Sequence, residues 1–121
     1  MKKKIIIAVV INNRANYARI RSFLIESKKS KKVKIELILA ASALVEKFGE
    51  LEKIIREDNL TISKKLFTIV EGDRPIAMAK STAIEISELA NVFENSKPDY
   101  VFAIADRFET LSVAIAASYM N

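Results

Sequence analysis

The chain has 121 residues, half of them hydrophobic, and a formal net charge of +5 at pH 7. This length suits one domain and is too short for two. The chain holds no cysteine and no histidine, which excludes disulfides, thiolate metal sites and catalysis by an imidazole. Any chemistry must therefore use carboxylates, Lys, Arg, Tyr or hydroxyl groups, and we expect neither a metal ion nor a cofactor.

The first strand–helix unit starts at the continuous apolar run Ile5–Ile11. This run favours a central strand buried on both faces and is too short for a signal peptide, so we expect a cytoplasmic protein with no membrane partner. Residues 12–16 form the turn after the strand, where asparagine tolerates unusual backbone angles and can cap a helix. The helix that follows carries Tyr17, Ile20 and Leu24 on one stripe.

A lysine cluster supplies much of the positive charge. It comprises Lys28, Lys29, Lys31, Lys32 and Lys34. Cations suit the C-terminal end of a helix, whereas a basic patch can also indicate nucleic acid. No aromatic residue is interleaved with these lysines, so we interpret the cluster as a solvated helix end and expect no nucleic-acid partner.

Two further strands and one helix are predicted in the middle of the chain. Val33–Ala40 alternates before becoming wholly apolar, which is typical of a strand. Ser42 is a cap candidate for a helix that bends or breaks at Gly49. The apolar positions of that helix are Leu44, Phe48, Leu51 and Ile55. Residues 66–70 predict a short third strand.

A long helix is predicted to start at Asp73-Arg74-Pro75, with Asp73 as the cap candidate and Pro75 in the first turn. Apolar residues at alternating spacings of three and four predict one narrow face packed against the sheet. This face comprises Ile76, Ala79, Ala83, Ile86, Ala90 and Phe93. The helix is expected to end over residues 95–98.

The last strand–helix unit holds two candidate site residues. Pro98 precedes a short apolar run that predicts a buried fourth strand, and residues 111–120 predict a buried helix. Asp106 and Arg107 therefore follow the carboxyl end of a strand, the edge at which open α/β sheets bind ligands. The alternative is that Asp106 only caps the next helix and Arg107 only solvates it.

The alternating order predicts an α/β fold, a Rossmann-like parallel sheet with right-handed crossovers. In the common strand order 3-2-1-4, Arg14 would converge with Asp106 and Arg107 beside one crevice. The glycines, Gly49 and Gly72, lie outside the turn after the first strand, which argues against a glycine-rich phosphate loop. Arginine forks would hold a phosphate instead, and Asp106 could serve as an acid or base.

Two motifs resemble those of hydrolysing UDP-N-acetylglucosamine 2-epimerases of the sialic-acid-pathway type. Asn13-Arg14-Ala15-Asn16-Tyr17 is similar to the Arg-Ala-Glu/Asp-Tyr turn after their first strand. Ala105-Asp106-Arg107-Phe108-Glu109 is similar to their Gly-Asp-Arg-Tyr/Phe-Glu/Asp segment. The stretches 55–59 and 66–70 also resemble the region before and through the family's third strand, so the resemblance spans nearly the whole chain.

The resemblance implies the N-terminal part of a glycosyltransferase-B-like fold, with residues 1–121 as a single, incomplete Rossmann-like domain. Such enzymes convert UDP-N-acetylglucosamine to N-acetylmannosamine and UDP by elimination and hydration with inversion at C2, and they form homo-oligomers. Arg14 and Arg107 would contact the UDP side of this UDP-sugar substrate, and Asp106 would be a catalytic acid/base carboxylate. We expect these 121 residues alone to be inactive.

The chain departs from the family at three positions, one of which is Ala18, where a hydroxyl residue is frequent. Asn16 replaces an acid in the first turn, and Ala105 replaces a glycine before Asp106. The alternative function is a stand-alone Rossmann-like nucleotide-binding or interaction module without catalysis.

Overall fold

Four parallel strands pair in the order β3-β2-β1-β4, which confirms the predicted strand order and the α/β class. The computed structural model describes residues 3–44, 50–104 and 109–120. The strands are β1 (Ile5–Ile11), β2 (Val33–Ala40), β3 (Lys64–Leu66) and β4 (Tyr100–Ala103). The helices are α1 (Arg14–Lys28), the short 3₁₀ helix η1 (Ala41–Leu44), α2 (Glu50–Glu57), α3 (Pro75–Ser96) and α4 (Glu109–Tyr119).

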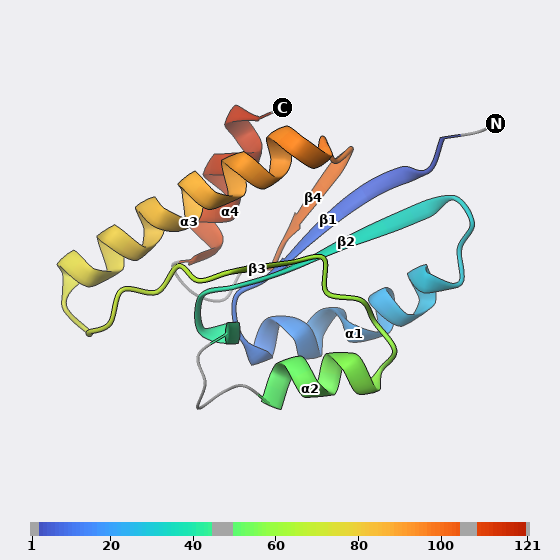
Figure 1. Ribbon diagram of the computed structural model, residues 1–121, viewed down its shortest axis with the longest axis horizontal. Coiled ribbons are helices and arrows are strands. Elements are labelled where there is room, and N and C mark those ends of the chain that lie inside the picture. The colour runs from blue at the N-terminus through green and yellow to red at the C-terminus, as the bar shows by residue number, and fades with distance from the viewer. Residues whose placement is uncertain (1–2, 45–49, 105–108, 121) are drawn as a thin grey trace.

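The helices cover both faces of the sheet, with α1 and α2 on one side and α3 and α4 on the other (Figure 1). Successive side chains of a strand point to opposite faces, so Val9 and Ile11 of β1 pack with α1 and α2, whereas Ala8 and Val10 pack in the second core with α3 and α4. This two-sided burial explains why β1 is apolar throughout. The predicted stripe of α1 is confirmed, because its members Tyr17, Ile20 and Leu24 are buried.

β4 is more exposed than its apolar sequence predicts. It pairs with β1 from Ile7↔Tyr100 to Val10↔Ala103, and no other strand in the described part of the chain pairs with its outer side. Tyr100 is 60% exposed. The prediction of a buried fourth strand is therefore wrong for the described residues, since a strand at the sheet edge is covered by only one neighbour.

The third strand was predicted over residues 66–70. The structure places it earlier and makes it shorter, since β3 spans Lys64–Leu66. Its partner β2 ends where Ala41 adopts a φ of 52°, which leaves the extended region. Beyond Leu66 the hydrogen bond between the two segments is made by a side chain and not by the backbone: the N–H of Ala41 donates to the Thr68 hydroxyl at 3.2 Å.

The buried face of α3 overlaps the predicted one only toward the C-terminal end of the helix, where Phe93 is buried and Ile86 is partly buried against the core. Ile76 is 54% exposed, and Ala79 and Ala83 are also exposed. The buried positions are Ala77, Ser81, Glu85, Leu89, Val92 and Phe93. Ser81 and Glu85 are polar, so a search for apolar residues alone missed the buried stripe in the N-terminal half of the helix. Ser81 is buried at no hydrogen-bonding cost, because its hydroxyl accepts from the backbone N–H of Val70 at 2.7 Å.

The ends of α3 match the predicted signals in part. Pro75 occupies the first turn as predicted, but the N-cap is Arg74 and has no side-chain capping bond, so the assignment of Asp73 as the cap is wrong. At the other end Lys97 has a φ of 46°, and its N–H donates to the carbonyl of Phe93 at 2.8 Å. This left-handed cap ends the helix just before Pro98, as predicted.

The predicted second helix is confirmed over α2, where Leu51 and Ile55 are buried. Phe48 and Gly49, with the predicted bend, lie outside the described residues. Ser42 lies within η1 and does not cap α2. Its hydroxyl donates instead to the carbonyl of Asn12, the residue after β1, at 2.9 Å.

α4 buries one face and exposes the other. Its buried residues are Glu109, Ser112, Val113 and Ala116, whereas Leu111 and Tyr119 are exposed. The helix predicted over residues 111–120 is confirmed, but its predicted burial is wrong for the outer face, because α4 packs on one layer only. Across residues 3–44, 50–104 and 109–120, no helix is both long enough and apolar enough to cross a membrane.

Candidate functional site

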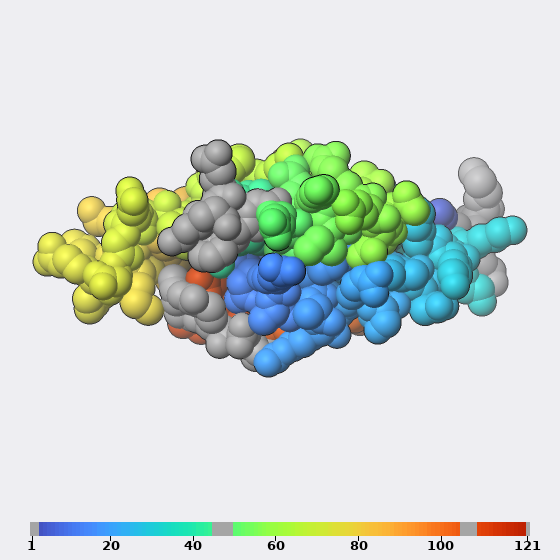
Figure 2. Space-filling view, turned by 90° about the horizontal axis from the view of Figure 1, so that it is seen from below, coloured from blue at the N-terminus to red at the C-terminus, as the bar shows by residue number. Residues whose placement is uncertain are grey.

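Arg14 is the first residue of α1 and its side chain is exposed. Figure 2 shows the dark-blue start of α1 at the molecular surface beside the green α2. Asp106 and Arg107, the other predicted site residues, lie outside the described residues. Their approach to Arg14 stays a prediction.

The turn that carries Arg14 is held by two asparagines. Asn13 is the N-cap of α1, and its side-chain oxygen accepts from the backbone N–H of Asn16 at 2.9 Å. The side-chain oxygen of Asn16 in turn accepts from the backbone N–H of Asn12 at 3.0 Å. The first bond satisfies a donor that a helix start leaves open and confirms the predicted capping role of asparagine in this turn, while the second ties the residue before the cap to the first turn of α1.

Asn16 also links the first turn of α1 to the chain after β4. Its amide nitrogen donates to the carbonyl oxygen of Ile104 at 3.5 Å, and the side chain is buried. Ile104 is the last described residue before the segment that contains Asp106. A carboxylate at position 16 could accept from Asn12 but could not donate to Ile104, so the neutral amide fits both of its neighbours.

A buried polar network lies beneath this edge of the sheet. Glu85 of α3 is 1% exposed. The Asn12 amide faces the Glu85 carboxyl, and with its nitrogen on that side it lies 2.8 and 3.1 Å from the two carboxyl oxygens. The Thr68 hydroxyl donates to Oε1 of Glu85 at 3.4 Å while it accepts from Ala41. The network therefore joins α3 to the ends of β1 and β2 and to the chain just after β3.

A second carboxyl group lies near Glu85. Glu109, the first residue of α4, is 2% exposed. Burial, together with the charge of Glu109, raises the pKa of Glu85 to about 8, although the hydrogen bond from Thr68 acts in the opposite direction. Glu85 therefore carries a proton at pH 7 in most molecules, so that the network holds one fewer negative charge than its residue types suggest.

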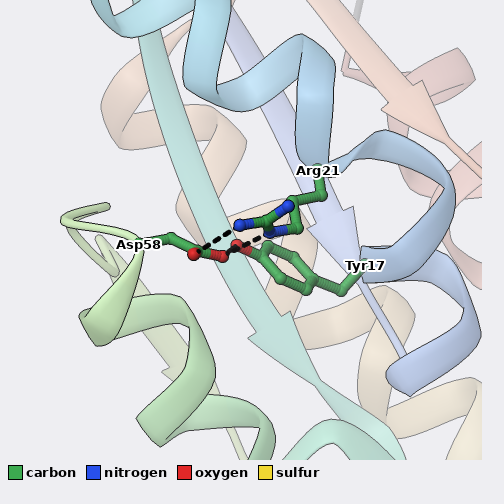
Figure 3. Close-up of polar contacts among 3 residues, drawn as sticks. All are labelled: Tyr17, Arg21 and Asp58. Carbon is green, nitrogen blue, oxygen red and sulfur yellow. Dashed lines mark hydrogen bonds and ion pairs between the residues drawn. The ribbon is translucent and has the colours of Figure 1, made fainter.

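Tyr17, in the same motif as Arg14, anchors α1 to the end of α2. Its hydroxyl donates to Oδ2 of Asp58 at 2.5 Å, and Arg21 donates to both oxygens of the same carboxylate at 2.7 and 2.8 Å (Figure 3). The Arg21 guanidinium, aided by Tyr17, lowers the pKa of Asp58 to about 2. Burial and the Asp58 carboxylate raise the pKa of Tyr17. We assign this cluster a structural role, because each of its polar groups is engaged within the protein.

Sequence reasoning missed the network, although it identified the turn. Glu85 was assigned to no buried face, because the predicted stripe of α3 used apolar positions only. One signal was available, since Glu85 lies four residues after Ser81 and four before Leu89 and so shares their side of the helix. No cluster of three or more acidic, histidine or cysteine residues that could hold a metal occurs in the described part of the chain.

A parallel sheet of order 3-2-1-4 between two helical layers, with polar side chains at its carboxyl edge, is a Rossmann-like domain. The sequence profile of the family described as UDP-N-acetylglucosamine 2-epimerase matches residues 25–121. The chain belongs to this family.

Relatives and a solved structure agree with this assignment. The chain is 31% identical over 115 residues to the hydrolysing GDP/UDP-N,N'-diacetylbacillosamine 2-epimerase of Campylobacter jejuni, covering 95% of this chain and 30% of the relative. It is 29% identical over 121 residues to the hydrolysing UDP-N,N'-diacetylbacillosamine 2-epimerase of Legionella pneumophila, covering all of this chain and 32% of that relative.

The fold resembles that of UDP-GlcNAc 2-epimerase from Neisseria meningitidis bound to UDP-GlcNAc. The TM-score is 0.78 at 19% identity, and the match covers 95% of this chain and 30% of the solved one. The chain thus spans about a third of the length of these proteins.

Proposed function

We propose that the chain is the N-terminal, incomplete Rossmann-like domain of a hydrolysing 2-epimerase that acts on a UDP-sugar. The observation that carries this proposal is the family match over residues 25–121. The printed activity of the two bacterial relatives and the UDP-GlcNAc bound in the solved structure support it.

The proposed reaction has two steps. A base removes the proton from C2 of UDP-N-acetylglucosamine while the bond from C1 to the UDP oxygen breaks, which leaves a C1=C2 double bond and free UDP. Water then adds at C1, and C2 is protonated on the opposite face to give N-acetylmannosamine. Acid–base groups and stabilisation of the leaving diphosphate are what this chemistry requires.

Three residues receive roles in this proposal. Arg14 and Arg107 bind the diphosphate, because a guanidinium fork matches phosphate oxygens and the chain has no glycine-rich phosphate loop. Asp106 is a catalytic acid or base. Arg14 is exposed at the start of α1, on the carboxyl edge of the sheet, and this position supports its proposed role in binding the diphosphate.

A second substrate is favoured by the two bacterial relatives, whose names specify diacetylbacillosamine. The experiment therefore offers the native polypeptide UDP-N-acetylglucosamine and the UDP-linked 2,4-diacetamido sugar separately. We expect free UDP and the C2-inverted sugar from at least one of them. In D₂O the product should carry deuterium at C2, whereas simple hydrolysis would leave C2 unlabelled and uninverted.

Variants test the assigned roles. Asp106→Asn should abolish turnover, and Arg14→Ala and Arg107→Ala should each weaken UDP binding about tenfold or more, as expected for loss of a charged hydrogen bond. Arg56→Ala is the matched control, because Arg56 lies on α2 in an exposed ion pair with Glu52. UDP binding without turnover of either sugar would favour the alternative of a non-catalytic nucleotide-binding module.

A further inference from the structure

An apolar patch lies on the surface where the chain that follows β3 meets α3. Phe67 is 76% exposed, and Ile69 and Ile84 are exposed as well. In Figure 1 the yellow-green chain that leaves β3 runs toward the start of α3. Single exposed apolar side chains are normal on a protein surface, whereas several that adjoin one another indicate an interaction surface. We call these three residues the Phe67 patch.

Two hydrogen bonds hold the members of the patch side by side. The Thr68 hydroxyl donates to Oε1 of Glu85 at 3.4 Å, and the backbone N–H of Val70 donates to the Ser81 hydroxyl at 2.7 Å. These bonds fix the chain after β3 against the turn of α3 that carries Ile84. Thr68 is buried between the two exposed residues of this chain, so those two residues border the same turn of α3 on its outer side.

Two opposite charges flank the patch on α3. Lys80 lies four residues before Ile84, and Glu88 lies four residues after it. Both charged side chains are exposed, and neither forms an ion pair within the described part of the chain. Residues four apart lie on one side of a helix. The surface therefore reads as a cation, an apolar centre and an anion, at equal spacings.

A second copy of the chain matches this order of charges. If two copies meet about a two-fold axis beside Ile84, their α3 helices run in opposite directions, and Lys80 of each copy lies opposite Glu88 of the other. A partner with charges of one sign would attract one of these residues and repel the other. We propose that the Phe67 patch, together with Lys80 and Glu88, is a two-fold surface through which two copies of the native polypeptide associate.

The first test uses the absence of cysteine from these 121 residues. Ile84→Cys places a thiol at the proposed axis, and Ser22→Cys, at an exposed position of α1, is the matched control. Each variant of the native polypeptide is treated with a short bismaleimide, with the wild type as the background for thiols elsewhere. We expect at least about tenfold more covalent dimer from Ile84→Cys, because facing thiols have a high effective concentration. Equal yields, or a thiol at position 84 that does not react with a monofunctional maleimide, would overturn the proposal.

The second test measures the dissociation constant of the dimer by analytical ultracentrifugation. Lys80→Glu and Glu88→Lys should each weaken the dimer about tenfold, because each change turns two attractive pairs into two repulsive ones. The double variant Lys80→Glu/Glu88→Lys restores opposite charges and should return to within about threefold of the wild type.

This restoration separates the proposal from a folding defect, which a second reversal would not repair. A double variant as weak as the two single losses combined would overturn the proposal, and so would a wild type that stays monomeric. Neither test involves a nucleotide, so the outcome is independent of the proposed function.

Discussion

The amide of Asn12 lies 2.8 and 3.1 Å from the carboxyl oxygens of Glu85, although Asn12 directly follows β1 and Glu85 lies in the middle of α3. This contact joins the central strand to the helical layer that closes one face of the sheet. Because Thr68 joins the same carboxyl group, polar side chains connect the strand ends just below the edge where Arg14 lies.

The stability of the protein should fall as the pH rises from about 4.5 to about 8. Glu85 has a folded pKa of about 8 against an ordinary value of 4.5, so in this interval the folded state binds a proton that the unfolded state has released. The stabilisation is complete below pH 4.5 and lost above pH 8. We expect a loss on the order of 5 kcal/mol in the free energy of unfolding, because one pKa unit corresponds to about 1.4 kcal/mol.

Urea unfolding at pH 5, 6, 7, 8 and 9 measures this slope. Glu85→Gln should flatten it over the same range, while Glu88→Gln should leave it unchanged. A wild-type stability that is constant from pH 5 to pH 8 would show that Glu85 ionises as easily in the folded as in the unfolded state.

Asp58 should produce the opposite slope in acid. Its folded pKa is lowered to about 2 from an ordinary 3.8, so its contribution is complete above pH 3.8 and lost as the pH falls through about 2. Asp58→Asn should lower the melting temperature at pH 7 by a few degrees and reduce the difference between pH 4 and pH 2. Thermal melts at these three pH values test this, and equal losses on acidification in both proteins would contradict it.

Asn16→Asp should destabilise the protein at pH 7. The new carboxylate cannot donate to the Ile104 carbonyl and would be ionised in a buried position, for which we expect a cost of about 1–3 kcal/mol. Asn91→Asp on the exposed side of α3 is the control and should change stability by less than about 0.5 kcal/mol. Chemical denaturation compares them, and equal effects would mean that the amide of Asn16 is not needed.

The buried face of α3 can be checked by truncation. Leu89→Ala should cost about 2–5 kcal/mol, because this side chain is wholly buried. Ile76→Ala should cost less than about 1 kcal/mol, since Ile76 is half-exposed. If urea unfolding showed a larger loss of stability for Ile76→Ala than for Leu89→Ala, the buried face would be the one predicted from apolar spacing.

Much of the fold follows from local patterns. The continuous apolar run of β1 indicated a strand with both faces covered, and the alternation of elements indicated a parallel sheet. The asparagine cap and Pro75 at the start of α3 could also be predicted, because capping and proline act within one helical turn.

The remaining features depend on partners that are distant in sequence. The apolar residues of β4 could not reveal that it lies at an edge, because burial of a strand depends on its neighbours. Glu85 was missed because sequence reasoning places a carboxyl group at the surface by default. Its burial can be predicted only when its protonation state and its hydrogen-bond partners are known. Thr68 and Asn12, which make its burial possible, follow other strands. Of the predicted site, the position of Arg14 is now described, whereas the roles of Asp106 and Arg107 rest on the family resemblance.

The central position of β1 has a consequence for synthesis on the ribosome. β1 can pair with β2 as soon as the first forty or so residues have emerged, but the strand's other neighbour, β4, and the helices that cover Ala8 and Val10 come from the last part of the chain. Until then an apolar face of the nascent sheet stays open to water. Late, non-local closure of this kind is slow and exposes the chain to aggregation, so the newly made N-terminal half is the part we expect chaperones to protect.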